Sequence, residues 1–262
     1  MWPEAWAQTM QDSRRSLLWW AIGIALYTVM VLAFFPLLKG NTALADLMQT
    51  LPESLRALAG DNLGTPAGYV GGKLLSTIPV LLTLYAALQG SALIAGQEER
   101  GWLEFPLSQP LPRGALLLGR TVALLTMLLA LGLTLFASIW LAGQVFAAPL
   151  PAGRLAGTVA LHVLGAWLFG ALTLALGAAT GRPGLAVGVG AGLGTGLVVV
   201  QSLASQVQVL SDLAWLNPWK YALSDLPLER GANAWPAVIC LLLGAALVAL
   251  AAPAFGNRDV SQ

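Results

Sequence analysis

Six long apolar segments, separated by shorter polar or proline-containing ones, dominate the pattern of the chain. They cover residues 17–38, 73–95, 116–143, 156–179, 185–204 and 234–254. An α-helix needs roughly 20 apolar residues to cross a bilayer. The pattern therefore predicts an all-α polytopic membrane protein with six transmembrane helices, in a single transmembrane domain that takes in residues 1–262.

Ahead of the first span, residues 3–15 are predicted to form a short interfacial helix. Trp2, Trp6 and Met10 recur every four residues, and Asp12 lies off that stripe. A helix with one apolar stripe and a charged remainder lies along a membrane surface. A frayed polar tail is the alternative.

Two of the connecting segments are long. Residues 39–70 hold leucines at helical spacing, which predicts an interfacial helix outside the membrane, either as a lid on the bundle or in contact with a substrate. Residues 205–233 mix aromatic, apolar and turn residues and are expected to dip into the membrane interface without crossing it. The apolar stripe of the first segment consists of Leu44, Leu47, Leu51, Leu55 and Leu58.

Glycines form two ridges on the fifth span. Gly188, Gly192 and Gly196 share one face at four-residue spacing, and Gly190 with Gly194 forms a second ridge. Small residues at this spacing let membrane helices approach closely. The first ridge is a possible subunit interface, and packing within the same bundle is the other interpretation.

Composition agrees with the membrane class. The chain is 57% hydrophobic and 10% charged, with a mean hydropathy of +0.75, whereas soluble domains carry about 25% charged residues. The net charge of +1 does not bear on a nucleic-acid partner, but the sequence has no basic run of the kind that binds phosphates, so none is expected. Membrane lipid is the expected surrounding partner.

Catalytic chemistry is not expected. Gly71-Gly72-Lys73-Leu74 does not complete a phosphate-binding loop, because Leu74 stands where a hydroxyl is needed. The single histidine, His162, has no metal-ligating neighbours in sequence and is predicted to be a hydrogen-bonded structural residue. We therefore predict that the chain is no enzyme and holds no metal.

The spans offer no charged groups through which ion movement could be coupled. Apart from residues near their ends, they contain no Asp, Glu, Lys or Arg. Ion-coupled carriers place such groups inside the membrane. Energy is therefore expected to come from outside the chain, through a surface element.

Residues 96–114 are the segment that we expect to be this surface element. This segment holds five of the 25 charged side chains in 19 residues, between two apolar runs. Gly96 and Gly101 would permit a turn out of the second span. Charged side chains give register to a protein interface, and buried aromatics such as Trp102 often dominate its energy. An ordinary solvated loop is the alternative.

The same segment resembles a motif of ABC-2 type permeases, the membrane subunits of ABC exporters. The family pattern Glu-Glu-x-Gly-Thr-Leu-Glu-x-Leu-Leu-Ser-x-Pro-Val-Ser-Arg resembles residues 98–113, with Trp102 in place of Thr and Phe105-Pro106 in place of an aliphatic pair. Leu216-Asn217-Pro218-Trp219 is similar to the Asn-Pro-aromatic segment before the last span of these proteins.

The resemblance implies a cytoplasmic coupling helix between the second and third spans, seated on a separate ABC ATPase. It also implies a second permease copy or paralogue, with ATP and Mg on the ATPase and no cofactor in this chain. The alternative function is a non-transporting scaffold or regulator that binds a cytosolic partner. The expected ATPase contacts are Glu98, Glu99, Arg100, Gly101, Trp102, Glu104 and Arg113.

The expected location is the cell inner (plasma) membrane, multi-pass, with both termini cytoplasmic. Six spans place both termini on one side. Basic residues divide seven against six between the two sides, a weak positive-inside signal. Arg14 and Arg15 before the first span, against Lys39 after it, favour cytoplasmic termini.

Overall fold

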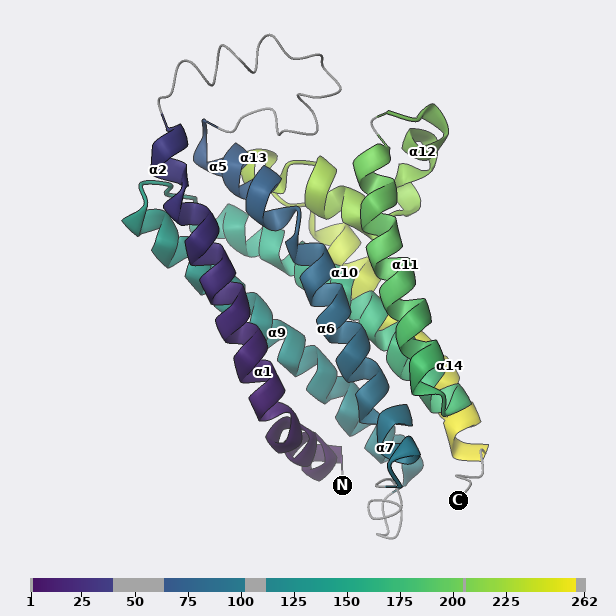
Figure 1. The fold of residues 1–262 in the computed structure, drawn as a ribbon. Coiled ribbons are helices and arrows are strands. Elements are labelled where there is room, and N and C mark those ends of the chain that lie inside the picture. Colours follow the sequence, from purple (N-terminus) through teal and green to yellow (C-terminus); the bar gives the residue numbers. More distant parts are fainter. Residues whose placement is uncertain (1, 40–63, 102–111, 205, 258–262) are drawn as a thin grey trace.

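Six long helices form an elongated bundle in a computed structural model, which describes residues 2–39, 64–101, 112–204 and 206–257 (Figure 1). Each is long and apolar enough to cross a membrane, the second together with the helical residues that precede it from Pro66. The all-α polytopic class is therefore confirmed. The helices are α1 (Trp2–Ala33), α6 (Ile78–Leu93), α9 (Arg113–Val145), α10 (Ala152–Thr180), α11 (Pro183–Leu203) and α14 (Ala234–Asn257).

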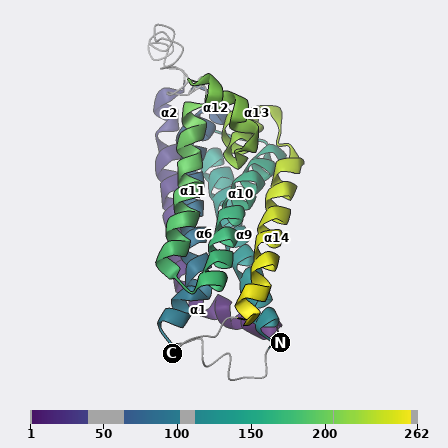
Figure 2. The same ribbon diagram turned by 90° about the vertical axis from the view of Figure 1, so that its right-hand side faces the viewer.

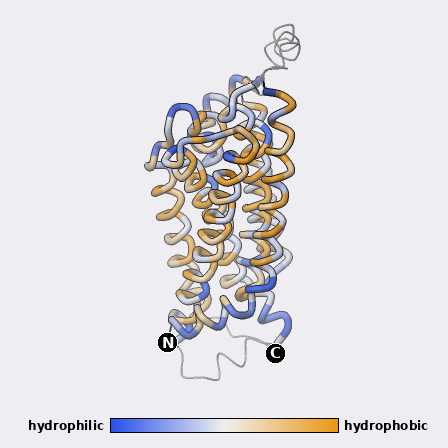
Figure 3. The backbone as a smooth tube through the Cα atoms, turned by 90° about the vertical axis from the view of Figure 1, so that its left-hand side faces the viewer, coloured by the Kyte–Doolittle hydropathy of each residue, from blue (hydrophilic) through white to orange (hydrophobic). Residues whose placement is uncertain are grey.

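Hydropathy follows the long axis of this bundle. Hydrophobic residues fill its middle, and hydrophilic residues gather towards its two ends (Figure 3). Helix α1 begins, and helix α14 ends, at the same end of the bundle (Figures 1 and 2). Polar ends on an apolar middle are the arrangement that a bilayer requires.

Helix α10 is the centre of the bundle. In its most apolar 18-residue stretch, 72% of the residues are buried inside the chain. The corresponding share is 22% for the spans of α1 and α11 and 28% for α14. Small residues bring α6 against it: a Cβ added at Gly90 would lie 2.5 Å from the carbonyl oxygen of Gly170. Helices α11 and α14 pack against α10, whereas α1 packs against α9, and all three leave much of their own apolar surface outside the chain.

The N-terminal region differs from the prediction. We expected an interfacial helix at 3–15 and a separate span at 17–38, but α1 is one continuous helix from Trp2 to Ala33. Residues 11–16 contain neither proline nor glycine, so nothing in them interrupts the helical hydrogen bonds. The first turns of α1 nevertheless run across the lower end of the bundle (Figure 2).

The regular α-helix is interrupted at the end of the first span and at the start of the second, where prolines and a π-helix occur. The first span turns at Phe34 into α2 (Phe35–Leu38). The second begins earlier than the predicted residue 73, in α5 (Pro66–Tyr69), where the side chain of Thr65 caps the first turn. It continues as the π-helix η1 (Val70–Leu75) before α6. The helix predicted within 39–70 otherwise falls at 40–63, outside the described residues.

Residues 206–233 form short helices that do not cross the bundle, as predicted. They are α12 (Gln208–Leu213), the 3₁₀ turn η2 (Ala214–Leu216), the π-helix η3 (Lys220–Ser224) and α13 (Pro227–Arg230). Trp215 is 61% exposed, but Trp219 is fully buried. The indole of Trp219 donates to the carbonyl of Gly194 at 2.9 Å and stacks on Phe169. The second half of the segment is therefore part of the core.

Candidate functional site

The chain leaves the second span at Ile94. This residue has φ −123° and ψ −69°, outside the helical region, and separates α6 from the short helix α7 (Ala95–Glu99). Gly101 follows with φ +70°, a left-handed conformation that glycine adopts without steric cost. We expected turns at Gly96 and Gly101. The first bend lies at Ile94 instead, and Gly96 is inside α7.

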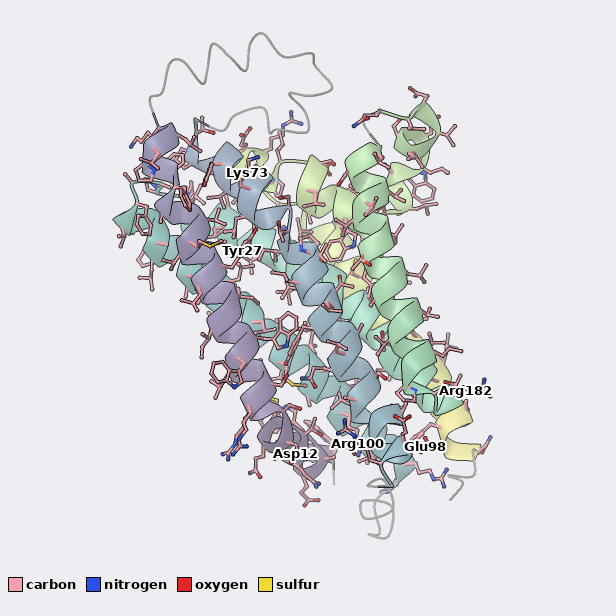
Figure 4. All side chains as sticks on the ribbon, viewed as in Figure 1. Asp12, Tyr27, Lys73, Glu98, Arg100 and Arg182 are labelled. Carbon is pink, nitrogen blue, oxygen red and sulfur yellow. The ribbon has the colours of Figure 1, made fainter. Side chains whose placement is uncertain are left out.

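The charged residues of α7 lie at the end of the bundle where both termini lie. Glu99, Arg100 and Gly101 are exposed, and Glu98 is half-buried. Figure 4 shows Asp12, Glu98, Arg100 and Arg182 at this end, from separate parts of the chain. Exposed charges that follow directly on an apolar span can meet a soluble partner without leaving water.

The turn between α10 and α11 belongs to the same surface. Glu98 and Glu99 line a shallow hollow together with residues 181–185. Gly181 has φ +66° and ends α10, and the hydroxyl of Ser91 donates to the carbonyl of Pro183 at 3.0 Å. Sequence reasoning treated 181–184 only as a tight turn. Its place on the same membrane side as 96–114 was the available signal.

A buried arginine links α7 to α9. Arg120 is only 3% exposed, and its Nη2 donates to the side-chain oxygen of Gln97. Its Nη1 is buried without a hydrogen-bond partner among the described residues. Asp12, on α1, is close enough to act on this guanidinium electrostatically. A buried charge with an unpaired donor is costly, so small movements of these three helices change the energy of Arg120.

The first turns of α1 complete this connection. A Cβ added at Gly119 on α9 would lie 2.7 Å from both the Cβ of Ala5 and the carbonyl oxygen of Trp2. The indole of Trp6 donates to the hydroxyl of Thr126 at 3.2 Å. The N-terminal turns therefore lie directly on α9, beside Arg120.

Arg113 has a role inside the chain. Its Nη1 donates to the carbonyl oxygens of Phe255 at 3.0 Å and Gly256 at 3.3 Å. These carbonyls belong to the last turn of α14, which lacks helical partners. The guanidinium thus holds the end of α14 against the start of α9. Two other predicted contacts, Trp102 and Glu104, lie outside the described residues.

The two glycine ridges of α11 face different surroundings. A Cβ at Gly188, Gly192 or Gly196 would meet no atom within 4 Å. A Cβ at Gly190 or Gly194 would overlap side chains of α6 and α10. Packing within the bundle therefore accounts for the second ridge and not for the first.

His162 lies at the centre of the bundle. It is fully buried, with Nδ1 2.8 Å from the carbonyl of Thr158 and Nε2 3.2 Å from that of Leu75. It is the hydrogen-bonded structural residue that we predicted. Within the described ranges, no three His, Cys, Asp or Glu side chains gather closely enough to hold a metal ion.

A family described as "ABC-2 family transporter protein" matches residues 7–260 of the chain. No curated protein matches the chain in sequence. The matched range includes α1 from residue 7 onwards, the other five long helices, α7 and the glycine ridges of α11.

Proposed function

The chain belongs to the ABC-2 family of transporter proteins, and we propose that it is the permease of an exporter driven by a separate ATPase subunit. The permease role follows from the family and the six membrane-length helices. The proposal adds three points. ATP hydrolysis on a partner drives the transport, α7 and the residues after it receive the partner, and cargo leaves the cell.

The observation that carries the proposal is the position of α7. It joins two spans and presents Glu99 and Arg100 to solvent beyond the apolar middle of the bundle. Charged pairs at such an interface fix register and partner choice more than affinity. A cytosolic ATPase seated here would also meet Arg182, which lies beside Glu98 in the shallow hollow.

Movement of α7 can reach the rest of the bundle through Arg120. The hydrogen bond to Gln97 joins α7 to α9, and the contacts of Gly119 join α9 to the start of α1. A nucleotide-dependent partner shifts the permease only if its contacts differ between two permease states. The unpaired Nη1 of Arg120 is a group whose surroundings would differ between such states.

A second permease chain is part of the proposal. Among the described residues, a Cβ on the open ridge of Gly188, Gly192 and Gly196 would meet nothing within 4 Å, and small residues at this spacing favour close helix pairing in membranes. We place a second copy, or a paralogue, against this ridge. The cargo would then pass between the two chains.

Orientation follows from the partner. If the ATPase is cytosolic, α7 is cytosolic, and both termini share its side because they lie at its end of the bundle (Figure 1). The N-terminal arginines Arg14 and Arg15 agree with this orientation. The proposed location is the inner (plasma) membrane of the cell.

The test is a charge exchange on α7. Glu99→Lys combined with Arg100→Glu keeps the net charge but reverses the pattern that the partner would read. Co-expressed with an ABC ATPase from the same genome, the wild-type chain should co-purify with that ATPase and change its ATP hydrolysis. The exchanged variant should lose at least tenfold in affinity, about 1.4 kcal/mol, because like charges then face each other.

The matched control exchanges two exposed charges at the opposite end of the bundle, Asp212→Lys with Arg230→Glu. This variant should behave as wild type. Absence of any ATPase partner, or equal effects of both exchanges, contradicts the proposal. A partner that binds while no cargo moves supports the scaffold alternative instead.

A further inference from the structure

A second feature lies at the end of the bundle away from α7. A cavity of about 290 Å³ opens between the start of the second span, α10, the end of α11 and the segment from η3 to α13. Ligand pockets in proteins begin at about 300 Å³, so this cavity suits a small molecule or the head of a larger one.

Both π-helices of the described residues contribute to its wall. Gly71, Gly72 and Leu75 come from η1, and residues 222–224 come from η3. π-helices account for well under 1% of residues and occur frequently at functional sites. A Cβ at Gly71 would meet no atom within 4 Å. This glycine therefore keeps space open and is not needed for packing.

Three of the four hydroxyl groups in the wall already donate their protons within the chain, and the fourth, that of Ser224, accepts from Gln201. The three donate to the carbonyl oxygen four residues earlier: Ser76 to Gly72 at 2.7 Å, Thr158 to Arg154 at 2.8 Å and Ser202 to Val198 at 3.0 Å. A hydroxyl that donates in this way keeps its lone pairs as acceptors. The wall is therefore rich in acceptors.

Gln201 adds a stronger acceptor. Its side chain is 6% exposed, and its Nε2 donates to the hydroxyl of Ser224 at 2.9 Å. Its Oε1 is buried and has no hydrogen-bond partner among the described residues. A buried carbonyl oxygen without a donor costs free energy, which a ligand bearing N–H or O–H groups would recover.

The described wall of the cavity carries one formal charge, that of a carboxylate. Among the described lining residues, Glu229 alone carries a formal charge. Arg154 lies next to it but donates to its backbone carbonyl, at 2.6 Å. The remaining wall includes the apolar side chains of Leu75, Leu223 and Leu228. Acceptors, one carboxylate and apolar walls together match a cation with N–H donors and a short hydrocarbon body.

We propose that this cavity is a binding site for small organic ammonium compounds, with Glu229 pairing with the ammonium group and Gln201 accepting one of its protons. Binding itself does not depend on the exporter assignment. The cavity lies at the end of the bundle away from α7. That this end faces outward, where a cargo would be released, rests on the proposed function.

The experiment uses the full chain in lipid nanodiscs without any ATPase, titrated with three probes and followed by saturation-transfer NMR. The probes share one hydrocarbon body: butylammonium, butyltrimethylammonium and butyrate. Butylammonium should bind saturably. Butyltrimethylammonium, which has the charge but no N–H, should bind at least fivefold more weakly. Butyrate should not bind.

Two variants locate the binding. Glu229→Gln should weaken butylammonium binding about tenfold, the effect of losing one charge-assisted hydrogen bond. Gly71→Leu should abolish it by filling the cavity. Gly153→Leu is the matched control, since it is an exposed helical glycine whose Cβ would also meet nothing, and should bind as wild type.

The proposal is wrong if butylammonium shows no saturable binding, or if butyrate binds as tightly as butylammonium. It is also wrong if the Glu229→Gln variant binds butylammonium with the same affinity as wild type. If Gly71→Leu fails to fold, Glu229→Gln decides alone, because its side chain is nearly isosteric. Failure here leaves the coupling proposal untouched, since no ATPase is present.

Discussion

The two glycine ridges of α11 are made of the same residue type on the same helix, yet they meet opposite surroundings. On the inner ridge, a Cβ at Gly190 would lie 1.8 Å from the hydroxyl oxygen of Thr173, and one at Gly194 would lie 2.3 Å from the methyl carbon of Thr83. On the outer ridge, a Cβ at Gly192 would meet nothing within 4 Å.

This difference separates two uses of glycine in a membrane helix. On the inner ridge, the missing side chains let α6 and α10 approach the α11 backbone, and any side chain would have to displace them. On the outer ridge, glycine lowers helix propensity without allowing a closer contact with any described part of the chain. The proposed second permease chain would give these glycines a use, because it would pack against them.

The largest effect is expected on the inner ridge. Gly194→Leu would place four carbon atoms where Thr83 and Phe169 already lie. Overpacking of this kind costs about 1–3 kcal/mol even for small insertions, and here it should exceed about 3 kcal/mol. We expect loss of the monodisperse species in size-exclusion chromatography and a lower unfolding temperature. A folded variant of unchanged stability would contradict the close packing.

An intermediate effect is expected on the outer ridge. Gly192→Leu adds a side chain where the chain itself has none, so the fold should persist. If a second copy packs there, the bulk would separate two helix backbones, and self-association should weaken by tenfold or more. Chemical cross-linking or analytical ultracentrifugation in detergent measures this directly.

Gly23→Leu provides the matched control for that variant. Gly23 lies on an exposed face of α1, and its Cβ also would meet nothing within 4 Å. Its substitution changes helix propensity and apolar area in the same way, without touching α11. Equal self-association of the two variants would show that the outer ridge faces lipid, and loss of folding with Gly192→Leu would place it inside the bundle.

The spans themselves could be read from the sequence because the signal is long. The predicted ranges 116–143 and 156–179 lie within α9 and α10, which extend a few residues further at each end. Most residues of these ends are polar or small, such as Arg113, Gln144 and Arg154, and hydropathy does not favour them, but the helical hydrogen bonds continue through them. The continuity of α1 was missed for the same reason: a change from polar to apolar residues is no helix break.

Contacts between distant residues could not be read from the sequence. Nothing in the sequence indicated that the guanidinium of Arg113, a predicted ATPase contact, reaches the end of α14, 142 residues away. The hydrogen bond between Arg120 and Gln97, 23 residues apart on α9 and α7, was not predicted either. The exposure of Glu99 and Arg100, by contrast, follows from local charge density, which requires no knowledge of packing.

The smallest predicted effect tests a single hydrogen bond on the inner ridge. Trp219 fills the space that Gly165 leaves open, and its Nε1 donates to the carbonyl of Gly194. Trp219→Phe keeps an aromatic ring against Phe169 but removes this donor and leaves a small void. One lost hydrogen bond costs about 1 kcal/mol, and the void adds to it, so we expect destabilisation of about 1–3 kcal/mol.

Trp215→Phe is the control for this variant, because Trp215 is 61% exposed and lies four residues earlier on the same segment. Its free energy of unfolding should change by less than about 0.5 kcal/mol. Thermal unfolding of both variants in the same detergent gives the comparison. Equal stability of the two would mean that the hydrogen bond from Trp219 to Gly194 does not stabilise the inner ridge. The contacts with α6 and α10, and the amide of Asn217 that donates to the carbonyl of Leu197 at 2.8 Å, would then hold α11 in place.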